Sequence, residues 1–129
     1  SIIKTAGYLV LEAVISLKKG DEEKIRAVMK ELSERRTEKQ PLDYPSAGST
    51  FKRPEGYFAG KLIMDSGLRG YRAGGAQVSE KHCGFVINAG GATAEDVRSL
   101  MDHVIRVVRE KYGVTLEPEV KFLGDFNGR

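Results

Sequence analysis

The sequence is poor in the features that would place it in several protein classes. Its 129 residues include one cysteine, Cys83, so no internal disulfide can form, and we expect a reducing compartment, the cytoplasm. No apolar run approaches the roughly 18 residues of a membrane-spanning helix, so we expect no membrane association. The two histidines, His82 and His103, lie 1 and 20 residues from Cys83, which is not the spacing of a metal site.

Several motifs are also missing. There is no G-x-G-x-x-G, no phosphate-binding P-loop and no G-x-S-x-G turn, so the common nucleotide folds and serine hydrolases have no support. The net charge is +3, with basic and acidic residues interleaved. Because a basic stripe with exposed aromatic residues is lacking, we expect no nucleic-acid partner. No obligate protein partner is inferred either.

The first part of the chain predicts one strand and one helix. The apolar run over residues 7–17 predicts a strand with two faces that both need to be covered. Asp21 is a candidate N-cap for a helix that continues to residue 40, with an apolar stripe along one face. The charged end of this helix, residues 33–40, could meet phosphate or could be a solvated helix end. We place a domain boundary between residues 40 and 46, where two prolines bracket an irregular connection.

The second part of the chain predicts an α+β domain with two main helices on a small mixed sheet. Its expected elements are a short helix over residues 57–66, a buried strand over 83–88 and an extended segment over 114–123. Thr93 and Asp96 predict a capping box at the start of the best helix in the chain. The predicted buried stripe of that helix consists of Val97, Leu100, Met101, Val104, Val107 and Val108.

A turn of small residues, Ala47-Gly48-Ser49-Thr50, lies between two prolines and could carry chemistry. Small residues let a ligand approach the backbone, and Ser49 offers a hydroxyl at that point. Lys52 and Arg53 follow, and such a pair could neutralise a diphosphate. An ordinary proline-flanked loop explains the same residues.

Two further positions are candidates for binding or proton transfer. Glu117 and Glu119 lie on the same face if their segment is extended, and a carboxyl beside an anionic substrate suits a general acid. The alternative is an exposed acidic edge. His82 precedes the predicted buried strand, at a strand mouth where binding groups often lie. The segment Gly91-Ala-Thr93 could bind an anion at a helix N-terminus or could simply cap the helix.

Four blocks of sequence, in order, resemble the UDP-N-acetylenolpyruvoylglucosamine reductase family. They are Tyr44-Pro-Ser-Ala-Gly-Ser-Thr-Phe-Lys-Arg-Pro54, Ala59-Gly-Lys-Leu-Ile63, Gly74-Gly-Ala-Gln-Val-Ser-Glu-Lys-His82 and Leu116-Glu-Pro-Glu-Val120. The helix that begins with Gly91-Ala-Thr-Ala-Glu-Asp-Val97 also fits. The resemblance spans essentially the whole chain, and its third block is similar to the branch with a shortened substrate loop.

The resemblance implies a division of labour along the chain. Members of this family bind FAD mainly through upstream domains and close the active site with a C-terminal substrate-binding domain. Residues 1–40 resemble the tail of the flavin-binding domain, which would explain a strand that needs cover on both faces. Residues 46–129 resemble the substrate-binding domain. The start without methionine suggests a piece of a longer protein, and the isolated chain is then expected to be inactive.

The resemblance also implies a reaction. Hydride passes from NADPH to FAD and then to the enolpyruvyl group of UDP-N-acetylglucosamine enolpyruvate, in the synthesis of peptidoglycan precursors. Ser49 matches the family's proton donor, and Glu119 matches the glutamate that assists it. Gly48 belongs to the turn that lies over the flavin.

For binding, the resemblance places Lys52 and Arg53 at the diphosphate and His82 at a polar substrate contact. The alternative function is a noncatalytic module for a nucleotide sugar or a phosphate, which would have kept the turn and lost the reductase.

Overall fold

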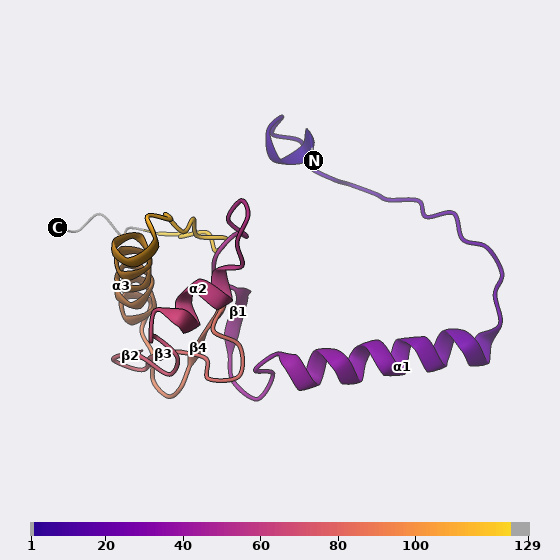
Figure 1. The fold of residues 1–129 in the computed structure, drawn as a ribbon. Coiled ribbons are helices and arrows are strands. Elements are labelled where there is room, and N and C mark those ends of the chain that lie inside the picture. Colours follow the sequence, from indigo (N-terminus) through magenta and orange to yellow (C-terminus); the bar gives the residue numbers. More distant parts are fainter. Residues whose placement is uncertain (1, 125–129) are drawn as a thin grey trace. The chain divides into compact units, whose positions relative to one another are not determined.

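The structure is a computed structural model that describes residues 2–124 (Figure 1). The chain divides into two units, one that ends at Ser33 and one that begins at Glu34, so the division falls inside the first helix. The boundary predicted between residues 40 and 46 remains a prediction. The last five residues of the predicted domain 46–129 lie outside the described residues. No helix within residues 2–124 is long and apolar enough to cross a membrane.

The N-terminal elements are a short 3-10 helix, η1 (Ile2–Lys4), and a long α-helix, α1 (Glu22–Lys39). Asp21 caps α1 as predicted, because its Oδ1 accepts a hydrogen bond from the amide of Lys24 at 3.0 Å. The predicted apolar stripe of α1 is about half exposed in this chain; its residues are Ile25, Val28, Met29 and Leu32.

The strand predicted over residues 7–17 is not formed. Every large apolar side chain in this stretch is exposed; these are Tyr8, Leu9, Val10, Leu11, Val14, Ile15 and Leu17. A strand requires a neighbour that accepts and donates its backbone hydrogen bonds, and no part of residues 2–124 supplies one here. The pattern of the side chains is therefore suitable for a strand, but residues 2–124 contain no pairing partner for it.

A four-stranded sheet forms the centre of the second unit, in the order β1-β4-β3-β2. The strands are β1 (Ser46–Ser49), β2 (Arg72–Ala73), β3 (Ala76–Val78) and β4 (Phe85–Asn88). The predicted α+β class and the strand within residues 83–88 are confirmed. Both β1, in the stretch that we interpreted as a turn, and the hairpin of β2 and β3 were missed.

All strand pairs are antiparallel, so the prediction of a mixed sheet was wrong. For the pairs β2–β3 and β3–β4, the reason is the length of the connections. Only Gly74 and Gly75 separate β2 from β3, and only residues 79–84 separate β3 from β4. Parallel neighbours need a crossover of a dozen residues or more, which these connections cannot provide.

The two helices of this unit form where the apolar spacing predicted them. The first, α2 (Ala59–Asp65), buries Ala59, Leu62 and Ile63, and Gly67 follows it with a φ of 80°. The second, α3 (Ala94–Tyr112), buries Leu100, Met101, Val104 and Val108, while Val97 and Val107 are partly buried against the same core. Helix α3 packs on β2, β3 and α2 (Figure 1).

Asp96 connects the start of α3 to the β2–β3 turn. It forms the predicted capping box with Thr93, and its Oδ2 accepts hydrogen bonds from the amides of Thr93 at 3.0 Å and Gly75 at 3.3 Å. Gly75 is required by space, because a Cβ there would collide with the carbonyl of Gly90 and the amide of Ala92. The hydrogen bonds from Thr93 and Gly75 lower the pKa of Asp96 below its ordinary value of 3.8.

This lowered pKa predicts a pH dependence of stability. A carboxyl with a depressed folded-state pKa stabilises the fold above the unfolded value, about 3.8, and loses that contribution as the pH falls through the folded value. The free energy of unfolding of the unaltered protein should therefore exceed that of Asp96→Asn at neutral pH. The difference should shrink below pH 3.8 in urea titrations. A difference that stays constant down to the lowest pH would contradict the charged cap.

Candidate functional site

Thr50 fixes the backbone directly after Ser49, at the end of β1. The pairing of β1 with β4 changes register between Ser46 and Ser49, which is the behaviour of a bulge. The buried Thr50 restores the hydrogen bonding to the β4 segment after this irregularity. Its amide donates to the carbonyl of Gly84 at 2.9 Å, and its Oγ1 accepts from the amide of Val86 at 2.9 Å. The backbone next to Ser49 is therefore fixed by these two hydrogen bonds of Thr50.

The segment from Glu117 to Glu119 runs alongside Thr50 to Lys52. The amide of Glu119 donates to the carbonyl of Thr50 at 2.8 Å, and the amide of Lys52 donates to the carbonyl of Glu117 at 2.8 Å. Phe51 and Pro118 form the antiparallel bridge between these two bonds. Two blocks of sequence that are about 65 residues apart therefore become neighbours.

A cleft of about 600 Å³ opens beside this junction. Five of the six predicted site residues line it: Ser49, Lys52, Arg53, His82 and Glu119. The sixth, Gly48, lies next to Ser49 on β1 and is not among the lining residues. Its φ is 83°, and no atom beyond its two chain neighbours lies within 4 Å of the place where a side chain would begin. The cleft is thus built from β1, the start of α2, the turn before β4 and the Glu119 segment.

The charged side chains that line the cleft are mainly positive. The lining contains five cationic side chains, from Lys52, Arg53, Lys61, Arg69 and Lys81, against the carboxylate of Glu119. The last three cations were not predicted. Lys61 lies in the predicted short helix and Arg69 lies between Gly67 and Gly70, and neither was singled out as a site residue. Nothing in the sequence indicated that the two would face the same hollow as Lys52.

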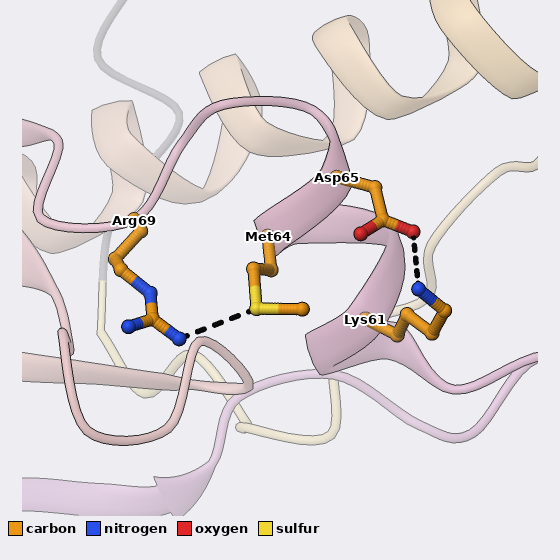
Figure 2. Close-up of polar contacts among 4 residues, drawn as sticks. All are labelled: Lys61, Met64, Asp65 and Arg69. Carbon is orange, nitrogen blue, oxygen red and sulfur yellow. Dashed lines mark hydrogen bonds and ion pairs between the residues drawn. The ribbon is translucent and has the colours of Figure 1, made fainter.

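The three lysines of the cleft already have oxygen partners. The Nζ of Lys52 lies 2.8 Å from Glu117, that of Lys61 lies 2.8 Å from Asp65 (Figure 2), and that of Lys81 donates to the carbonyl of Thr37 at 2.7 Å. Hydrogen bonding and attraction to Glu117 raise the pKa of Lys52, with a smaller contribution from the charge of Glu119. The same pair lowers the pKa of Glu117.

The two arginines differ from the lysines, because neither has an oxygen acceptor within residues 2–124. Arg69 donates from Nη2 to the thioether sulfur of Met64 at 3.2 Å, as Figure 2 shows, and thioethers are weak acceptors. Arg53 lies with its Cζ 4.1 Å from the centroid of the Phe58 ring. Both guanidinium groups therefore retain N–H donors for an anion such as a carboxylate or a phosphate.

His82 is held in one orientation by the turn before β4. The Oγ of Ser79 accepts hydrogen bonds from the amides of Lys81 and His82, both at 3.2 Å. The imidazole lies edge-on to Phe85 with the centroids 4.9 Å apart, and its Nδ1 accepts from the amide of Gly84 at 3.1 Å. Because an accepting ring nitrogen carries no proton, the proton of the neutral ring is on Nε2.

The remaining polar clusters do not form a metal site. Within residues 2–124, no group of three or more histidine, cysteine and carboxylate side chains could hold a metal ion. The one cysteine, Cys83, is buried at the wall of the cleft. His103 lies on α3 away from the cleft, where its ring stacks on Tyr71 at a centroid distance of 4.4 Å.

Comparison with known proteins agrees on one family. The family model described as UDP-N-acetylenolpyruvoylglucosamine reductase, C-terminal domain, matches residues 40–123. The enzymes of that name from Lachnoclostridium phytofermentans and Caldanaerobacter subterraneus subsp. tengcongensis are 66% and 59% identical to this chain over 125 residues. The aligned stretch is 97% of this chain but 40% and 41% of those relatives, so the chain spans about two fifths of their length.

The fold has a counterpart among solved structures. The crystal structure of UDP-N-acetylenolpyruvylglucosamine reductase from Thermus caldophilus matches with a TM-score of 0.66 and 38% sequence identity. The match covers 82% of this chain and 37% of that one.

The geometry of His82 predicts its tautomer. Long-range ¹H–¹⁵N correlation spectra at a pH where the ring is neutral should show the proton on Nε2, because Nδ1 accepts from Gly84. The variant His103→Gln removes the other histidine and so assigns the signals. Gly84→Ala should disturb the hydrogen bond to Nδ1, because its Cβ would lie 2.9 Å from Cε1 of His82 and displace the ring. A proton found on Nδ1 in the unaltered protein would refute this assignment.

Proposed function

This chain belongs to the UDP-N-acetylenolpyruvoylglucosamine reductase family, and we propose that it is the part of such a reductase that binds UDP-N-acetylglucosamine enolpyruvate and protonates it. The observation that carries the proposal is the cationic cleft, in which Ser49 and Glu119 meet two arginines that lack oxygen acceptors within residues 2–124. The product is UDP-N-acetylmuramate, a precursor of peptidoglycan.

The charge of the proposed substrate suits the charge of the cleft. The substrate carries a diphosphate and a carboxylate, all of which are anionic at neutral pH, and the cleft offers five cations against one carboxylate. Arg53 and Arg69 are the strongest candidates for direct contact, because binding an anion costs them no existing oxygen partner. Lys52 and Lys61 would have to leave Glu117 and Asp65 or share them. We therefore assign direct binding of the diphosphate to the two arginines. The lysines would contribute a positive electrostatic potential around them.

We assign the proton transfer to Ser49. Reduction of the enolpyruvyl double bond adds a hydride to the terminal carbon and leaves a carbanion-like centre beside the carboxylate, which takes up one proton. The hydroxyl of Ser49 is exposed in the cleft and has no hydrogen-bond partner within residues 2–124, so it is available to donate. A carbanion is basic enough to deprotonate an alcohol that is positioned beside it.

We assign to Glu119 a supporting role at the same centre. Its amide donates to the carbonyl of Thr50, the residue after Ser49, and both Ser49 and Glu119 line the cleft. Lys52 lies close enough for the charge of Glu119 to affect the pKa of the lysine. A carboxyl in this position can interact with the developing charge on the substrate.

The cofactors follow from the family. A bound FAD, itself reduced by NADPH, would supply the hydride. The feature of this chain that suits a flat ring is the edge strand β1 at Gly48, where the lack of a side chain leaves the half-buried backbone open. None of the described residues forms a phosphate-binding loop for the rest of FAD, so we propose that upstream domains hold it.

We propose that residues 1–40 are the tail of the flavin-binding domain and that the substrate-binding domain starts near residue 46. The exposed apolar side chains of residues 8–17 support this, because they are suited to a neighbour that residues 2–124 do not contain. We also propose a cytoplasmic location, consistent with the single unpaired cysteine.

The role of Ser49 predicts that two half-reactions separate. In the complete flavin-loaded protein, Ser49→Ala should leave reduction of the flavin by NADPH unchanged, because that step takes no proton from Ser49. Reoxidation by the enolpyruvyl substrate should slow by roughly 10²–10⁴-fold, the usual effect of losing a positioned acid. Glu119→Gln should impair the same half-reaction.

Anaerobic stopped-flow absorbance of the flavin follows each half-reaction. Ser99→Ala is the control, since Ser99 is an exposed serine of α3 that does not line the cleft. Normal reoxidation by Ser49→Ala, or a loss confined to flavin reduction, would rule out the assignment.

A further inference from the structure

We propose that Phe58 is a positioning residue, which holds the guanidinium of Arg53 so that its donors are directed to a phosphate group of the ligand. The inference rests on the proposed function, because it concerns how the same cleft recognises a diphosphate. Phe58 is not among the predicted site residues, and its contact with Arg53 is visible only in the folded chain.

The first observation is the way in which Arg53 is held. Its Cζ lies 4.1 Å from the centroid of the Phe58 ring, and it makes no hydrogen bond or ion pair within residues 2–124. The preceding residue, Lys52, is held instead by an ion pair with Glu117 at 2.8 Å. A cation over an aromatic face is attracted by the ring and gives up none of its N–H donors to an oxygen atom. Arg53 is thus restrained and still able to bind.

The second observation is the exposure of Phe58. Its side chain is 60% exposed, although Phe51, seven residues earlier, is only 5% exposed in the core. Both rings line the cleft. An isolated exposed phenylalanine is not unusual. Here, however, the ring stands beside the arginine of the preceding block, and its exposed surface is part of the proposed binding site.

The third observation is the position of Phe58 at the start of α2. It is the N-cap residue, with φ −116° and ψ 120°, and it makes no side-chain capping bond. Serine, threonine, aspartate and asparagine are favoured at this position, because their side chains accept a hydrogen bond from an amide of the first turn, which a phenylalanine cannot do. A local rule that is broken without a local gain points to a functional use of the side chain. The contact with Arg53 is such a use.

The arrangement also explains why an arginine suits this position. A phosphate can be bound by two parallel N–H donors of a guanidinium, provided that the fork faces it. A free arginine side chain loses rotational freedom when it binds, and prior restraint by a ring lowers that loss. Phe58 therefore acts through Arg53, and the two side chains should be energetically coupled.

A double-mutant cycle tests this coupling in the complete protein. Dissociation constants for UDP, the probe, are measured by calorimetry for the unaltered protein, Phe58→Leu, Arg53→Ala and the double variant. Phe58→Leu should weaken UDP binding by roughly two- to fivefold, the range expected for an exposed cation–ring contact. In the Arg53→Ala background, the same change should have no further effect, because there is then no guanidinium to hold. Phe58→Tyr, which keeps the ring, should bind as the unaltered protein does.

The outcomes separate the inference from the proposed function. If the unaltered protein does not bind UDP, the proposed function fails and this inference fails with it. If UDP binds but Phe58→Leu weakens binding equally with and without Arg53, the ring acts on the ligand or on the fold directly, and the positioning role is overturned. Phe58→Met is a second ringless variant in case Phe58→Leu does not fold, and it should show the same coupling.

Discussion

Two backbone hydrogen bonds hold the site together. They join Thr50 to Glu119 and Lys52 to Glu117, each at 2.8 Å, with the Phe51–Pro118 bridge between them. These bonds bring Ser49, near the start of the domain, and Glu119, near its end, to the same cleft. The remaining structure supports this junction: β4 fixes Thr50 from one side, while α2 and the turn before β4 form the other walls.

Much of the second unit could be predicted from local patterns. Helix α3 has a continuous apolar stripe and a capping box, and α2 and β4 also formed within the ranges that their patterns predicted. The β2–β3 hairpin was missed because two and three residues are too few to show a period. The stretch over residues 7–17 is apolar enough for a strand, but residues 2–124 contain no pairing partner for it, and a pattern of side chains cannot report on that.

The candidate site was predicted only in part, because some of its features depend on contacts that a local sequence pattern does not contain. The serine turn and the Glu-Pro-Glu segment stand out as motifs, and the family resemblance ordered them, but it could not show which cations were available. The lysines of the cleft are held by oxygen atoms, whereas Arg53 and Arg69 are held by a ring and a sulfur atom. That distinction depends on contacts between residues that are not adjacent in sequence. It adds Arg69 to the predicted pair of Lys52 and Arg53, and it distinguishes the two arginines from the lysines.

The central claim is that this cleft binds the nucleotide-sugar part of the substrate. The most direct measurement is a titration of the ¹⁵N-labelled protein with UDP-N-acetylglucosamine, followed by amide chemical shifts. We expect saturable shifts clustered at Lys52, Arg53, Arg69 and His82, which line the cleft. No saturable shift, or shifts centred on the hollow along α3 at Arg106 and Arg109, would contradict it.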